Sequence, residues 1–362
     1  MVTNRYVYCL IAINALISII IYVPRILLQH RFDGAWTSIL LSVVISYLLI
    51  RWFTTMLASF TRQGFPEMMK QYLPNWVNVS VQLLMIGLWF FAGAITLLSF
   101  VDITLRYISP DVPAFLVMIG YLIVVCWACT LNPASILFGL EILLVLNCPI
   151  VAFFIIRAIT SPMFDWDAVL QTFTFSLQWP SFQAVAAATF LFTGYINLVV
   201  FNRVFEKFHM RGYLLISLSG LLLLLLTMIV PIGMHGSMGV STYVYPWFSL
   251  ADSIRIDMFL VERLVFVFYL VYISLFLIST IVHWHVAQNL ARGLIRFPAA
   301  ARGSKYIPLG IVVVFATASM WMLKFNQEGL IRSGEIFLEI RLVAEFIFVL
   351  LIFYMYRKEK KK

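Results

Sequence analysis

The chain has 362 residues, of which 63% are hydrophobic and only 11% are charged, with a net charge of +9. Soluble globular domains carry roughly 25% charged residues, so this composition excludes a soluble fold. Apolar runs recur along the whole chain, and a helix needs about 20 apolar residues to cross a bilayer core. The composition therefore predicts an all-α integral membrane protein with a single transmembrane domain over residues 1–362.

Polar breaks divide the apolar runs into ten predicted transmembrane helices, with boundaries good to about three residues. In chain order they are Tyr6–Leu28, Trp36–Leu57, Val79–Phe100, Val112–Thr130, Ser135–Ile159, Phe182–Phe201, Tyr213–Met234, Val261–Leu290, Tyr306–Leu323 and Phe337–Tyr356. A basic segment, residues 357–362, follows the last helix.

The distribution of Lys and Arg tests this count independently, because these residues accumulate in cytoplasmic loops. An even number of spans with both termini in the cytoplasm places the main basic clusters on the cytoplasmic side. These clusters are Arg51, Arg62 and Lys70; Arg203, Lys207 and Arg211; Arg292, Arg296, Arg302 and Lys305; and Arg357, Lys358, Lys360, Lys361 and Lys362. The net charge thus reflects topology and contact with anionic lipid headgroups, and it predicts no binding to nucleic acid.

Polar residues inside the predicted spans deserve the most attention, because an unpaired polar group in hydrocarbon is costly and is kept for packing or for function. They are Asn14, Ser18 and Pro24 in the first span and Thr193, Gly194, Tyr195 and Asn197 in the sixth. Gly194 permits a helix break whose freed backbone groups bind a ligand, or it lets two helices approach closely. The sequence leaves both alternatives open.

Ionisable residues inside the spans are few. Glu141 in the fifth span could relay a proton or accept a cation, or it could be a paired carboxyl close to the cytoplasmic end. Glu345 follows Arg341 by four residues, a spacing that predicts an ion pair within one helix. His283 and His285 fall on different helix faces, so no metal site is predicted. The sequence also lacks nucleotide-binding and hydrolase motifs, which argues against an enzyme and against a cofactor.

Four stretches, in this order along the chain, resemble the permease-like B subunit of GerA-type spore germinant receptors, a member of the spore germination permease family. They are Val23-Pro24-Arg25 with Asp33-Gly34-Ala35-Trp36; Phe65-Pro66-Glu67 with Tyr72-Leu73; Tyr245 to Leu250; and Phe259-Leu260-Val261-Glu262-Arg263. No single stretch is very specific, but their shared order is, and with the length and the basic tail the resemblance covers essentially the whole chain.

This family belongs to the amino acid/polyamine/organocation transporter superfamily, so the resemblance implies a LeuT-like fold. That fold has two inverted five-helix repeats, here about 6–159 and about 182–323, and its first and sixth helices are broken near the midplane to bind a small solute. The chain departs from its relatives in three places, which implies a more apolar or degenerate pocket. These are Ile17-Ser18-Ile19-Ile20 in place of small residues, the region of Ile136 in place of an Arg, and Ile196 or Asn197 in place of an acidic residue.

The resemblance predicts a germinant-sensing subunit of the spore inner membrane or the bacterial plasma membrane. It would bind a small nutrient, an amino acid being the expected class, and signal to a larger membrane A-type subunit and a lipoprotein C-type subunit. The predicted ligand contacts are Asn14, Ser18, Thr193, Gly194, Tyr195, Asn197, Ser279 and Thr280. The alternative is a proton- or sodium-coupled amino acid transporter with Glu141 as its relay.

Overall fold

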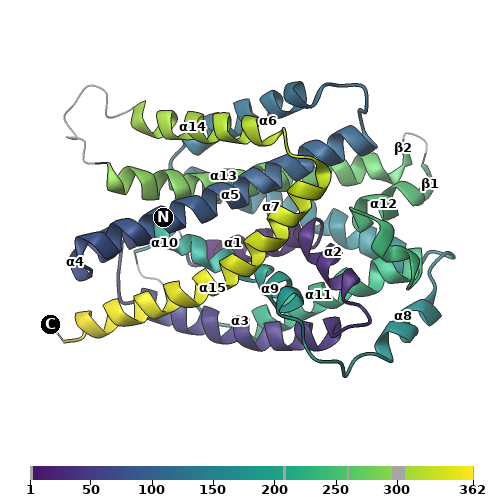
Figure 1. The fold of residues 1–362 in the computed structure, drawn as a ribbon, viewed down its shortest axis with the longest axis horizontal. Coiled ribbons are helices and arrows are strands. Elements are labelled where there is room, and N and C mark those ends of the chain that lie inside the picture. The colour runs from purple at the N-terminus through teal and green to yellow at the C-terminus, as the bar shows by residue number, and fades with distance from the viewer. Residues whose placement is uncertain (1–2, 207–208, 259–260, 296–305, 362) are drawn as a thin grey trace.

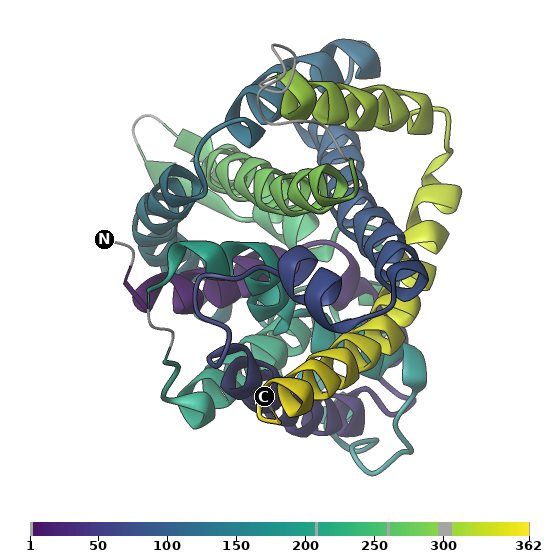
Figure 2. The ribbon, with the colours of Figure 1, turned by 90° about the vertical axis from the view of Figure 1, so that its left-hand side faces the viewer.

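The computed structural model describes residues 3–206, 209–258, 261–295 and 306–361. Long helices pack side by side in a bundle, and both chain termini lie at the same end of it (Figure 1; Figure 2 views the bundle from that end). Several residues used above lie outside the described ranges, namely Lys207, Phe259, Leu260, Arg296, Arg302, Lys305 and Lys362.

The helices of the bundle follow the predicted order. They are α1 (Arg5–Ser18), α2 (Tyr22–Gln29), α3 (Ala35–Leu57), α5 (Asn75–Tyr107), α6 (Ala114–Cys129), α7 (Pro133–Ile159), α9 (Phe182–Phe190), α10 (Leu198–Phe201), α11 (Tyr213–His235), α13 (Leu264–Leu294), α14 (Ile307–Met322) and α15 (Gln327–Glu359). The 3-10 turns η1 (Thr193–Asn197) and η2 (Asn202–Val204) flank α10. Among these, α5 and α13 pack along each other.

Shorter elements cap the two ends of the bundle. They are α4 (Phe65–Tyr72), α8 (Trp166–Phe173), η3 (Gly239–Thr242), α12 (Pro246–Ser253) and the antiparallel strands β1 (Arg255–Met258) and β2 (Val261–Arg263). In Figure 1, α4 lies near the termini, whereas α8, α12 and the hairpin lie at the opposite end. The predicted all-α body is confirmed, with this short hairpin added, so that α13 begins three residues later than the predicted eighth span.

Length and composition identify a membrane protein. Over the described residues, five helices are long and apolar enough to cross a bilayer, or seven if each of two bent helix pairs counts as one span. The three other predicted spans correspond to α6 and α14, apolar helices of 16 residues each, and to α15, whose 33 residues include several charges. Five to seven helices are therefore candidate spans by length and composition, and ten spans remain a prediction.

Pro24 explains the break in the first predicted span. The axes of α1 and α2 differ by 54° across Ile19–Ile21. In a continuous helix, a proline removes one backbone hydrogen bond and its ring clashes with the carbonyl four residues earlier, which here belongs to Ile20. Pro24 instead lies in the first turn of α2, where a missing N–H is tolerated.

The sixth predicted span is also broken, between α9 and the tighter turns that follow it. The axis bends by 61° between Phe182–Phe190 and Thr193–Val204, and the Gly194 region adopts the 3-10 turn η1. A 3-10 turn inside a longer helix often marks a hinge or a functional site.

Candidate functional site

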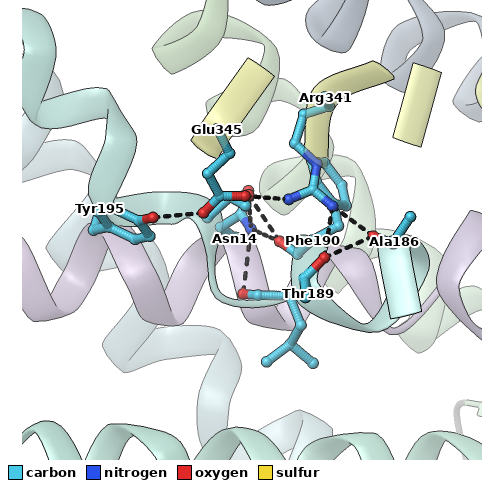
Figure 3. Close-up of polar contacts among 9 residues, drawn as sticks. Asn14, Ala186, Thr189, Phe190, Tyr195, Arg341 and Glu345 are labelled. Atoms are coloured by element: carbon cyan, nitrogen blue, oxygen red, sulfur yellow. Dashed lines mark hydrogen bonds and ion pairs between the residues drawn. The ribbon is translucent and has the colours of Figure 1, made fainter. Parts of the chain in front are cut away.

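Asn14 of α1 joins the two broken spans. Its side-chain amide donates hydrogen bonds to the Phe190 carbonyl at 2.7 Å and to the Thr193 hydroxyl at 3.3 Å (Figure 3). The last carbonyls of a helix have no partner within that helix, so a donor from elsewhere must satisfy them. Asn14 supplies this donor at the end of α9, and the end of α9 is thereby fixed against α1.

Gly194 lies where the backbones of α1 and η1 approach each other closely. A Cβ atom added to it would lie 2.1 Å from the Leu10 carbonyl oxygen and 2.7 Å from the Ile11 Cα. Only a residue without a side chain fits between these backbones. Of the two alternatives for Gly194, the geometry matches close helix approach, and its carbonyl accepts a hydrogen bond from Asn197 at 3.2 Å.

An ion pair from α15 inserts beside the same break (Figure 3). Arg341 and Glu345 lie 2.5 Å apart, and their side chains are only 8% and 3% exposed. Arg341 also donates to the Ala186 carbonyl at 2.5 Å and to the Thr189 hydroxyl at 2.9 Å, both on α9. The predicted i, i+4 pair is confirmed, and in addition it binds the helix that precedes the break.

Tyr195 completes this network from the other side of the break. Its buried hydroxyl donates to Glu345 at 2.5 Å, so the carboxylate accepts bonds from both Tyr195 and Arg341. The ring of Phe190 lies 5.4 Å from the Arg341 guanidinium, within the range of a cation–π contact. The pair is thus held from α9 and η1 together.

A small cavity borders this network. It leaves about 40 Å³ for the centres of water molecules, which is room for a few waters. Its walls come from α5, the broken sixth span, α13 and α15, and its polar lining includes Trp89, Thr193, Asn197, His283, Arg341 and Glu345. The Trp89 indole donates to the Asn197 side-chain oxygen at 2.7 Å across the cavity wall.

The predicted ligand contacts are distributed unevenly around this cavity. Thr193 and Asn197 line it, whereas Asn14 and Tyr195 border it through the hydrogen bonds described above. Ser18 donates to the Asn14 carbonyl at 2.6 Å and lines a second, smaller cavity.

The two predicted contacts on α13 do not line the cavity. Thr280 donates to the Phe276 carbonyl in its own helix and to the Gly93 carbonyl of α5. Ser279 contacts the His283 imidazole, and His283 rather than Ser279 lines the cavity. The prediction from sequence missed Trp89, and it placed Arg341 and Glu345 in an ion pair without assigning that pair to the site.

Glu141 lies apart from the cavity. It forms an ion pair with Arg5 at 3.0 Å, and the two side chains are 25% and 63% exposed. Over the described residues, no group of three His, Cys, Asp or Glu side chains is arranged to hold a metal ion.

Comparison with known proteins places this architecture in a family. The family model for spore permeases, described as "Spore germination protein", matches residues 1–327. No curated protein matches the chain. The matched region contains both broken spans and ends where α15 begins. It covers most of the 362 residues, and the chain therefore belongs to the spore germination protein family of permease-like membrane proteins.

Proposed function

We propose that the chain is the permease-like B subunit of a spore germinant receptor. It binds a small nutrient, an amino acid, beside the break of the sixth span, and binding shifts a conformational equilibrium that the larger A-type membrane subunit and the C-type lipoprotein detect. The family match supports the germination role, and the two bent helix pairs support a solute site of the LeuT type.

The proposal includes the finer architecture. Ten spans form a 5+5 inverted repeat, with repeats at about 6–159 and 182–323, and both termini lie in the cytoplasm of the spore inner membrane or plasma membrane. Both termini lie at the same end of the bundle in Figure 1, which is consistent with an even number of spans.

The observation that carries the proposal is the buried cavity at the break of the sixth span. Solute sites in transporter folds lie where helices are interrupted, because an interrupted helix offers polar groups inside the membrane. Here Thr193 and Asn197 of η1 provide such groups, and Asn14 bridges to the other broken span.

Thermal stabilisation of the purified protein in detergent tests this site. A ligand that binds only the folded state raises the apparent Tm, so at least one compound from a panel of amino acids, sugars and nucleosides is expected to do so. Thr193→Val removes a cavity hydroxyl at nearly constant volume and is expected to weaken that binding about tenfold.

Thr317→Val is the matched control. Thr317 is exposed on α14, and its hydroxyl donates to the Val313 carbonyl in the same helix. Its ligand response should equal that of the unmodified protein. The site assignment is wrong if both valine variants respond alike, and the ligand-binding function is wrong if no compound raises the Tm.

The transporter alternative is tested at Glu141. Because the Arg5–Glu141 pair is partly exposed, solvent screens it and Glu141→Gln is expected to leave both the Tm and the ligand response unchanged. Uptake into proteoliposomes that needs an ion gradient and disappears in Glu141→Gln would establish coupled transport with Glu141 as relay instead.

A further inference from the structure

We infer that Arg341 and Glu345 of α15 are ligand-binding residues and that the ion pair between them must open for the ligand to bind. The ligand chemistry that fits them is a carboxylate close to an ammonium group. This inference rests on the proposed function, which places a nutrient in the same cavity, and it adds the two charged groups that select the nutrient.

The first observation is an unused donor on Arg341. A guanidinium carries five N–H donors. The two terminal nitrogens bond to Glu345, Ala186 and Thr189, but the Nε atom is buried and has no hydrogen-bond partner among the described residues. An unpaired buried donor is costly, and here it belongs to a cationic side chain that lines a cavity. An incoming carboxylate oxygen would satisfy it.

The second observation is the spare acceptor capacity beside it. A carboxylate offers about four lone-pair sites, and Glu345 uses them for one bond from Tyr195 and one from Arg341. The Thr193 hydroxyl and the Asn197 side chain line the same cavity. An ammonium group, which carries three donors, therefore has acceptors within the same small space.

Charge balance explains why both ligand groups are needed. The pair is neutral as a whole and lies in a low-dielectric interior, where any added net charge is penalised. A simple acid would leave one negative charge uncompensated, and a simple amine would leave one positive charge. A zwitterion keeps the total at zero while each of its ends meets an opposite charge.

The cavity is too small for such a ligand while the pair stays closed. It accommodates a few waters, and Arg341 is tied to α9 through Ala186 and Thr189. Ligand binding must therefore enlarge the cavity, and we expect this to occur by separation of Arg341 from Glu345 and movement of α15 relative to α9. Since α15 lies beyond the residues matched by the family model, the site is shared between the matched body and a helix outside it.

The first test needs no variant. Each amino acid that raises the Tm of the full chain in detergent is compared with its decarboxylated amine and its deaminated acid, for example alanine with ethylamine and propionate. The amino acid is expected to stabilise the protein at concentrations at which neither analogue does. Equal stabilisation by the amine or the acid overturns the inference.

The second test changes the charge of one partner. Glu345→Gln keeps the side-chain volume and an oxygen for Tyr195, but it leaves Arg341 uncompensated. This variant should prefer the deaminated acid over the amino acid. Its affinity for the amino acid relative to the acid should fall by about tenfold or more, because a charged contact is lost. Glu339→Gln, on the same helix outside the cavity lining, is the control and should retain the original preference.

The outcomes separate this inference from the proposed function. Stabilisation by a sugar or nucleoside alone, or an unchanged preference in a folded Glu345→Gln protein, overturns the role of the pair and leaves a nutrient site in place. Stabilisation by none of the compounds overturns both. If Glu345→Gln does not fold, the comparison of analogues on the unmodified protein decides alone.

Discussion

Gly194→Ala is expected to lower the free energy of unfolding by about 3 kcal/mol or more, at the upper end of the usual cost of overpacking. The added Cβ would lie 2.1 Å from the Leu10 carbonyl oxygen and 2.7 Å from the Ile11 Cα. These are backbone atoms, so they cannot turn away as a flexible side chain can, and α1 must move as a whole. Thermal melting and size-exclusion chromatography of the detergent-solubilised variant measure the loss.

Gly139→Ala is the matched control for this substitution. Gly139 lies within α7, and a Cβ at that position meets nothing within 4 Å. Alanine favours a helix over glycine by about 1 kcal/mol, so the control should melt at the same temperature or slightly above. Equal melting of the two variants would contradict the close approach of α1 and η1. Substitutions of Gly194 therefore test folding rather than ligand binding.

Glu345→Leu is expected to destabilise the protein by about 3–5 kcal/mol, because it leaves the Arg341 charge buried without its partner. The double variant Arg341→Met with Glu345→Leu should recover most of that loss, since apolar residues of similar volume commonly replace a buried ion pair without a net cost. The double variant should nevertheless have no response to an amino acid, because both charge-recognising groups are gone.

Apparent Tm and ligand response of the single and double variants provide the measurement. Glu339→Leu, at a half-buried position on the same helix, is the control and should change the Tm little. A double variant that melts as low as Glu345→Leu would show that the two side chains stabilise the fold by contacts other than their mutual attraction. A double variant that still responds to an amino acid would contradict the binding role.

The two broken spans were expected from the resemblance to a LeuT-like fold, and the structure shows that their causes are local. Pro24 is incompatible with a continuous helix, and a glycine in an apolar run permits a break or a close approach. Apolar length likewise predicts where helices begin and end, which is why α3 and α7 match the predicted spans within about two residues. The first break forms even though the residues around it, Ile17 to Ile20, are mostly large.

The cavity lining was harder to predict, because it depends on contacts between residues far apart in the chain. The spacing of Arg341 and Glu345 predicted their pairing within one helix. It contained no information about Ala186 and Thr189, which lie about 150 residues earlier. The position of each helix about its own axis is set by packing, and neighbouring residues on a helix point about 100° apart. In this packing, His283 lines the cavity, whereas Thr280, one turn earlier on the same helix, donates to the Gly93 carbonyl of α5.

The length of α15 gives the ion pair a mechanical connection to the cytoplasmic end proposed for the bundle. From Glu345 to Glu359 the helix contains no Gly or Pro, and it spans roughly 21 Å at 1.5 Å per residue. At its far end, Lys358 donates to the Tyr72 carbonyl at 3.1 Å, and Tyr72 donates to Glu359, both contacts with α4. An uninterrupted helix that is held by contacts at both ends transmits displacement along its axis. Opening the ion pair would therefore shift or strain α4, the short helix beside the termini.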